Sequence, residues 1–124
     1  MLEYGKFKDR MNEHKAIAKE MLDYFSECPE ERLIAGRFAN GGKYQNTTGP
    51  NATQFCLRGA WHQLIGNDAW ISDRDSEEKE FFQFLGFEGT YYSNSASEAA
   101  VFNNQEIRAG NYHAILERLE KAAA

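Results

Sequence analysis

The feature that most constrains the fold is the spacing of apolar residues near the start of the chain. Between Lys6 and Phe25 they recur at steps of three and four, while charged residues fill the opposite face: Phe7, Met11, Ile17, Ala18, Met21, Leu22 and Phe25. This spacing places the apolar side chains on one face of an amphipathic helix. Pro29 follows shortly after, where it cannot continue that helix. The sequence therefore predicts a first helix whose apolar face must be covered by other elements.

Four later segments also carry sequence signals typical of helices, none of them stronger than that of the first helix. A second helix is predicted from Pro50-Asn51, with Asn51 or Thr53 as its cap, to a stop at Gly66-Asn67. The others are residues 75–87, a segment beginning near residue 95, and residues 111–121.

Capping patterns support two of these helices. Asp75 and Glu78 have the spacing of a capping box, with Gly86 closing the far end, and Ser95 and Glu98 repeat the same spacing. Residues 32–45 are ambiguous between a strand and a helical turn, and residues 40–51 are predicted to form a loop.

The fold class that follows is mainly α. We expect a compact single domain of about five helices, with a short β-hairpin or strand near residues 32–45 left open. The domain is assigned to residues 1–121, and Ala122–Ala124 are set aside as a cloning-derived tail. A chain of 124 residues, 42% of them hydrophobic, can bury one core without metal or disulfide staples.

Cysteine content and hydropathy bound the cellular setting. The two cysteines, Cys28 and Cys56, follow no basic and apolar leader, which favours reduced thiols and the cytoplasm. No apolar run is long enough to cross a bilayer. The cysteines and histidines show no metal-ligand spacing, so neither a metal nor a cofactor is expected.

The most patterned stretch is Phe55-Cys56-x-x-Gly59-Ala60. If this stretch is helical, its small residues form a groove, because a glycine inside a helix usually permits close approach of another backbone. We interpret the groove as the surface on which the first helix packs, with Cys56 as a small buried hydrophobic residue.

The alternative for this stretch is a thiol-dependent enzyme. Cys56 would be its nucleophile, with His62 or His113 as the base. A helical position about one turn inside the helix counts against activation, which is strongest at a helix N-terminus. His62, six residues on, would point away from the thiol. We therefore expect no catalytic residues.

A second candidate site is a ligand site around the predicted loop. Lys43 and Tyr44 lie in the loop, and Arg37 and Arg58 flank it; together they could meet the phosphate of a small nucleotide or similar metabolite. The sequence GGKYQNTTGP lacks the spacing of a P-loop.

The charge of the chain is concentrated in one segment. The net charge is −5, and residues 66–98 hold eight acidic and two basic residues. Such a balance argues against non-specific binding to nucleic acid. The candidate surface for a basic protein partner comprises Trp70, Asp73, Asp75, Glu77, Glu78 and Glu80. Helix capping is the simpler explanation of the same acids, and Trp61 and Trp70 could each be core or surface.

Two stretches carry a family resemblance: ATQFCLRGAW and VFNNQEIRAGNYHAILERLEKA. The chain resembles a family of small uncharacterised proteins of bacteriophages and some bacteria, marked by an aromatic-Cys-x-x-Gly-Ala helix. The likeness spans about residues 15–121 in the order of its elements, with Asn103-Asn104 standing where the family has Asn-Asp.

The resemblance implies a phage accessory protein. Together with the acidic segment it leads to our first hypothesis, a non-enzymatic protein that binds and modulates a host macromolecule, for example an inhibitor of a defence system such as a CRISPR effector. The nucleotide binder and the thiol enzyme are the second and third hypotheses, and a monomer and a homodimer remain equally open.

Overall fold

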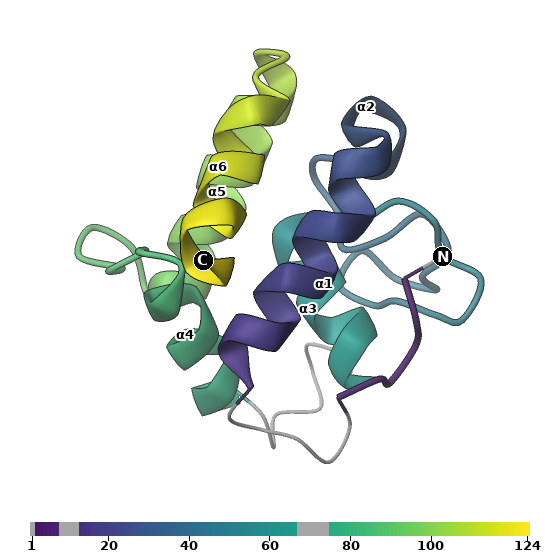
Figure 1. Cartoon of the computed structure of the whole chain (residues 1–124), viewed down its shortest axis with the longest axis horizontal. Coiled ribbons are helices and arrows are strands. Elements are labelled where there is room, and N and C mark those ends of the chain that lie inside the picture. The colour runs from purple at the N-terminus through teal and green to yellow at the C-terminus, as the bar shows by residue number, and fades with distance from the viewer. Residues whose placement is uncertain (1, 8–12, 67–74) are drawn as a thin grey trace.

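The computed structural model describes residues 2–7, 13–66 and 75–124, and these ranges contain six helices and no sheet. In chain order the helices are α1 (His14–Glu27), α2 (Pro29–Arg32), α3 (Leu57–Ile65), α4 (Asp75–Phe84), α5 (Ser95–Arg108) and α6 (Tyr112–Ala123) (Figure 1). The prediction of a mainly α fold is confirmed.

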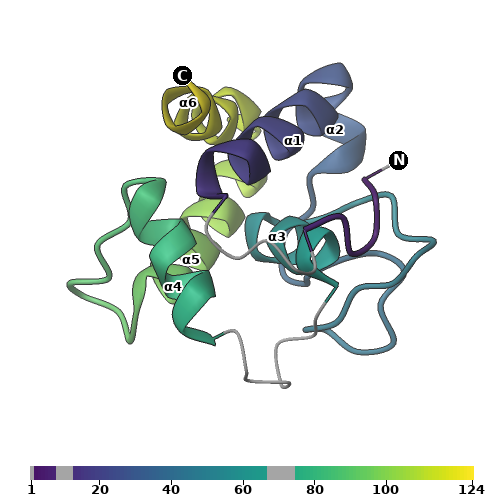
Figure 2. The same cartoon turned by 60° about the horizontal axis from the view of Figure 1, so that its bottom comes forward.

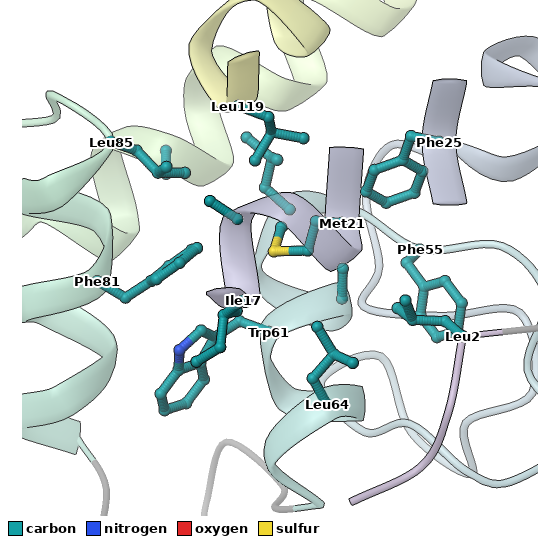
Figure 3. Close-up of a cluster of buried hydrophobic side chains, with 14 of the residues drawn as sticks. Leu2, Ile17, Met21, Phe25, Phe55, Trp61, Leu64, Phe81, Leu85 and Leu119 are labelled. Atoms are coloured by element: carbon teal, nitrogen blue, oxygen red, sulfur yellow. The ribbon is translucent and has the colours of Figure 1, made fainter. Parts of the chain in front are cut away.

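The helices pack in two layers, which Figure 2 shows most clearly. Helices α1 and α6 lie side by side in one layer, and α3, α4 and α5 form the other. The apolar face predicted for the first helix lies at the interface between the two layers, which we call the seam. Met21 of α1 lies among Trp61 of α3, Phe81 of α4 and Leu119 of α6, all buried (Figure 3). Each such side chain contributes about 1.5–3 kcal/mol through removal from water, so this seam holds the domain together.

The first helix begins later than predicted. It starts at His14, whereas the sequence predicted a start near Lys6. Phe7 is buried in a separate N-terminal segment whose backbone runs beside α3, where Phe7 N donates to Leu64 O at 2.8 Å. Met11 lies outside the described residues. The periodic spacing therefore runs through two buried segments, the one that contains Phe7 and α1, which do not form a single helix.

The second predicted helix also begins later. Helix α3 starts at Leu57, and its cap is Cys56, not Asn51 or Thr53. Its end is as predicted: Gly66 has the left-handed φ of 77° that favours glycine at a helix C-terminus.

The capping pattern at α5 is shifted by one residue. The cap is Asn94, whose side chain accepts from the backbone N–H three residues on at 2.9 Å. Ser95 instead donates to a carbonyl of α4 at 2.7 Å. Glu98 accepts from Gly89 N at 3.2 Å, in the loop before the helix. Gly86, with φ of 97°, closes the turn after α4 as predicted.

The hairpin considered for residues 32–45 is absent. The described residues there form only isolated bridges, Leu33 with Phe55 and Ala39 with Phe55. The short helix α2, with Pro29 as its first residue, precedes them. The segment is thus a loop whose backbone pairs at two points with one residue, Phe55.

Two of the three C-terminal alanines belong to the last helix. Helix α6 extends through Ala123, and Ala122 and Ala123 pack against the core. The helix therefore runs past residue 121, where the domain was predicted to end.

Candidate functional site

The Phe55-Cys56-x-x-Gly59-Ala60 motif joins the long loop to α3. Phe38 O accepts from Cys56 N at 3.1 Å, and the same carbonyl lies against the α-carbon of Gly59. A β-carbon at Gly59 would sit 1.7 Å from Phe38 O. The expected close backbone approach at Gly59 is present, but the backbone belongs to the loop at Phe38 and not to the first helix.

Cys56 is the N-cap of α3, so its predicted position inside the helix is wrong. Its Sγ accepts from Gly59 N at 3.3 Å, and the residue is only 5% exposed. Burial raises the pKa of the Cys56 thiol to about 11, although hydrogen bonds from the Gly59 and Arg58 backbone act in the opposite direction. A nucleophilic thiol needs a lowered pKa. Cys56 therefore has the environment of a structural residue.

The two histidines considered as a base are both elsewhere. His62 Nε2 lies 2.8 Å from a carboxylate oxygen of Glu78, and its ring stacks on Phe38 with centroids 5.0 Å apart. His113 is exposed on α6. No group of three or more histidine, cysteine or acidic side chains in the described ranges is arranged to hold a metal ion.

A buried ionic cluster of Arg58, His62 and Glu78 joins α3 to α4. Arg58 makes a bidentate contact with Glu78, Nε to Oε2 at 2.9 Å and a terminal nitrogen to Oε1 at 2.8 Å, and His62 binds the same Oε2. Glu78 is 2% exposed. Burial by itself would raise the pKa of Glu78, but hydrogen bonds from His62 and Arg58 and the charges of both lower it to about 2. The cluster therefore holds a carboxylate ionised inside the protein.

This ionic cluster corrects two predicted sites. Glu78 cannot belong to an exposed docking surface, and its carboxylate does not close a capping box with Asp75. The guanidinium of Arg58 is hydrogen-bonded to the Glu78 carboxylate, and it also stacks over Phe38, 5.1 Å from the ring centroid. It does not join Lys43 in a phosphate site.

The remaining acids of the proposed docking surface are scattered. Asp75 is exposed and pairs with Lys79 at 3.1 Å. Glu80 is exposed, 3.9 Å from His14 Nε2, and Glu77 is partly buried. Asp73 and Trp70 lie outside the described residues. Trp61, whose position was open, is in the core.

A pocket of about 680 Å³ lies between the loop of residues 36–46 and α5. Its polar and aromatic lining comprises Arg37, Phe38, Tyr44, Gln45, Asn46 and Asn104. Of the four predicted ligand residues, Arg37 and Tyr44 line this pocket, and Lys43 lines a smaller hollow that shares both of them. Arg58 is not in either lining. The structure thus brings together three of the four predicted ligand residues, Arg37, Lys43 and Tyr44.

Two adjacent asparagines of α5 fix the pocket wall. Asn104 Oδ1 accepts from Gly36 N at 2.9 Å. Asn103, fully buried, accepts from Leu57 N and donates to Ile34 O, both at 3.1 Å. These are the asparagines noted in the family resemblance. They tie the loop to α5 and to the start of α3, so the wall is preformed.

A second exposed feature is the loop between α4 and α5, residues 88–94, which we call the tyrosine loop. Tyr91 is 91% exposed and Tyr92 is 42% exposed. Gly89 closes the base of the loop: its φ is 77°, and a β-carbon there would lie 2.6 Å from the backbone of Asn94. With Gly89 N bound to Glu98, the loop is fixed where it leaves and rejoins the helices.

Residues missed by the sequence reasoning carry weak local signals. Asn104 stands four residues after Ala100, the spacing of one helix face, and both line the pocket. Tyr91 and Tyr92 stand between Gly89 and Asn94, residues typical of loops. The first pattern does not by itself mark a pocket wall, and the second does not separate an exposed aromatic side chain from a buried one.

Comparison with models of protein families, with curated proteins and with solved structures found no match for this chain. None of the helices in the described ranges combines the length and the apolar character needed to cross a bilayer.

Proposed function

We propose that this protein is a non-enzymatic binding protein that docks onto a basic protein surface through its tyrosine loop. The observation that carries the proposal is the exposure of Tyr91 on a loop with a fixed base. Tyrosine is enriched at protein interfaces because its ring offers a large contact area with few rotatable bonds. A fixed base reduces the ordering cost of association.

The charges around the tyrosine loop support a basic partner. Glu88 is exposed within the loop, and Thr90 Oγ1 donates to its carboxylate at 3.4 Å. Glu98 lies at the base of the loop. Between residues 75 and 98 the one basic residue is Lys79, which Asp75 already neutralises in part. Carboxylates beside aromatic anchors favour encounter with a cationic surface.

The biological role that we propose is modulation of a host macromolecule by a phage accessory protein. A CRISPR effector is a specific case to test, because it holds its guide–target duplex in a positively charged channel. A rigid, acidic and aromatic loop has the chemistry to compete for such a channel. The resemblance to small phage proteins supports this role.

The experiment measures association of the full chain with a purified CRISPR effector–guide complex across a salt series. We expect Tyr91→Ser to weaken binding by at least about tenfold, since a tyrosine at the centre of an interface can contribute about 2 kcal/mol or more. Glu88→Lys should lower the association rate most at low salt, where screening is weakest. Glu120→Lys, an equal charge change at an exposed position of α6, is the matched control.

Two results would contradict the proposal for this partner class. One is the absence of binding to the effector at low salt. The other is binding that Tyr91→Ser and Glu88→Lys change no more than Glu120→Lys does, which would place the contact elsewhere on the molecule.

A further inference from the structure

We infer that the pocket between residues 36–46 and α5 is a binding site for a nucleotide, a ligand with one planar heterocycle and one phosphate. This inference does not depend on the docking proposal. The long loop that carries the pocket and the tyrosine loop project on opposite sides of the molecule in both views (Figures 1 and 2). Different residues carry each site.

The first observation is a set of cationic side chains around the pocket. Arg37 and Lys43 are exposed and line the pocket and its adjoining hollow. The guanidinium of Arg108 lies 3.9 Å from the point where a β-carbon of Gly36 would be, beside a residue that lines the pocket. Within the described ranges, no carboxylate forms an ion pair with these three cations.

Unpaired cations gathered in this way are unexpected in a chain of net charge −5. Arginine is suited to phosphate because its planar guanidinium can donate two parallel hydrogen bonds. Arg37 already holds one loop carbonyl, Gly42 O, at 3.3 Å, which leaves most of its donors available. The rim therefore has the chemistry of a phosphate site built from side chains.

The helix dipole does not supply this phosphate site. The first N–H groups of α3 are occupied within the protein: Leu57 N donates to Asn103, Gly59 N to Cys56 Sγ and Ala60 N to Cys56 O. An anion in the pocket would meet none of them. Recognition of phosphate thus depends on Arg37, Arg108 and Lys43, and it should respond to their removal.

The second observation concerns the planar part of the ligand. Among the residues that line the pocket, Tyr44 has an exposed aromatic side chain, and Gln45, Asn46 and Asn104 have amide side chains. Phe38 also lines the pocket, but its ring packs against His62 and Arg58. Asn104 uses its oxygen for Gly36 N, and no acceptor for its amide N–H groups is found in the part of the chain that the structure describes. Asparagine and glutamine amides match the paired donor and acceptor on the edge of adenine, and aromatic rings stack on its face.

The size and rigidity of the pocket suit a nucleotide. A volume of about 680 Å³ lies within the usual range of small-molecule sites. The wall is preformed: Gln45 Nε2 donates to Gly36 O at 2.6 Å, and Phe38 N donates to Gln45 O at 2.8 Å. A preformed wall lowers the cost of ordering on binding.

The test is isothermal titration of the full chain with AMP, with adenosine and with inorganic phosphate as separate probes. We expect AMP to bind most tightly, adenosine to bind at least about tenfold more weakly because it lacks the charge-assisted contacts, and phosphate alone to bind weakest. Arg37→Ala should weaken AMP about tenfold and leave adenosine unchanged. Arg108→Ala should act in the same direction.

Lys15→Ala, which removes an exposed cation from α1, is the matched control. Thermal unfolding of each variant separates lost binding from lost folding, and Arg37 is exposed with one long hydrogen bond, so its removal should leave the melting temperature unchanged. No binding of AMP, GMP, CMP or UMP would overturn the inference. So would AMP binding that Arg37→Ala and Arg108→Ala weaken no more than Lys15→Ala does, or phosphate that binds as tightly as AMP.

Discussion

The buried carboxylate of Glu78 yields the sharpest prediction about stability. Glu78→Gln keeps the shape of the side chain but removes the charge that Arg58 and His62 contact at 2.8–2.9 Å. A carboxyl group whose pKa falls from 4.5 to about 2 on folding stabilises the folded state by about 3 kcal/mol at neutral pH. Because Glu78 is buried, solvent screening reduces this value little. The expected fall in melting temperature is about 10 °C for a domain of this size.

The pH dependence of this stabilisation has a definite sign. The folded pKa of Glu78 lies below the unfolded value, so the ionised group stabilises the fold above about pH 4.5, and this contribution is lost as the pH falls towards 2. The difference in free energy of unfolding between wild type and Glu78→Gln should therefore be largest at pH 7 and shrink below pH 4.5. Urea unfolding followed by circular dichroism at a series of pH values measures it.

Glu80→Gln is the matched control, because Glu80 is an exposed carboxylate on the same helix. Its effect should stay within about 0.5 kcal/mol at every pH. If Glu78→Gln destabilises the fold equally at pH 7 and pH 2.5, the loss comes from packing or amide geometry, and the reasoning about its charge is refuted.

Three further predictions concern the motif at the start of α3. Gly59→Ala should destabilise the fold by about 2–3 kcal/mol because its β-carbon would meet Phe38 O, although helix propensity alone favours alanine by about 1 kcal/mol. Gly59→Leu should cost at least as much as alanine. A raised melting temperature of the alanine variant would contradict the contact. Cys56→Ala should lose about 1 kcal/mol with the cap and Cys56→Ser less, measured by urea unfolding. A mild thiol reagent should label the partly exposed Cys28 before Cys56 in the native protein, and rapid labelling of Cys56 would contradict its structural role.

The helical content was predictable because it depends on local periodicity, whereas helix ends depend on distant partners. Residues preceding α3 could have formed another helical turn, but Asn40 Oδ1 accepts from the backbone N–H groups of Thr53 and Gln54 at 2.9 and 3.1 Å and holds them extended. Such a contact between segments separated by a long loop leaves no periodic signature in the sequence. The start of α3 was therefore misplaced by about two turns.

Around Glu78, acidic composition predicted an exposed surface, whereas the helical spacing of the apolar residues that follow indicates a buried side chain. Glu78 was grouped with its acidic neighbours, yet Phe81, Phe82 and Leu85 follow it at the spacing of one helix face, and all four are buried. That spacing was the available signal for a carboxylate that points inward. Glu78→Lys should therefore destabilise the fold, because it removes the carboxylate that Arg58 and His62 contact and places a second cation beside Arg58.

Helix α5 connects the two proposed sites and explains how an acidic protein can display a cationic pocket. At its N-terminus, Asn94 caps the helix and Glu98 holds the base of the tyrosine loop. Two to three turns later, Asn104 holds the pocket wall, and Arg108 at the other end lies beside Gly36, which lines the pocket. Glu98 thus lies in the first turn of the helix and Arg108 in its last turn. This is also the order that the helix dipole favours, so the separation of charge reinforces the fold. Because the two surfaces are separated along one rigid helix, a protein partner and a small anion could occupy the molecule together without competing for the same side chains.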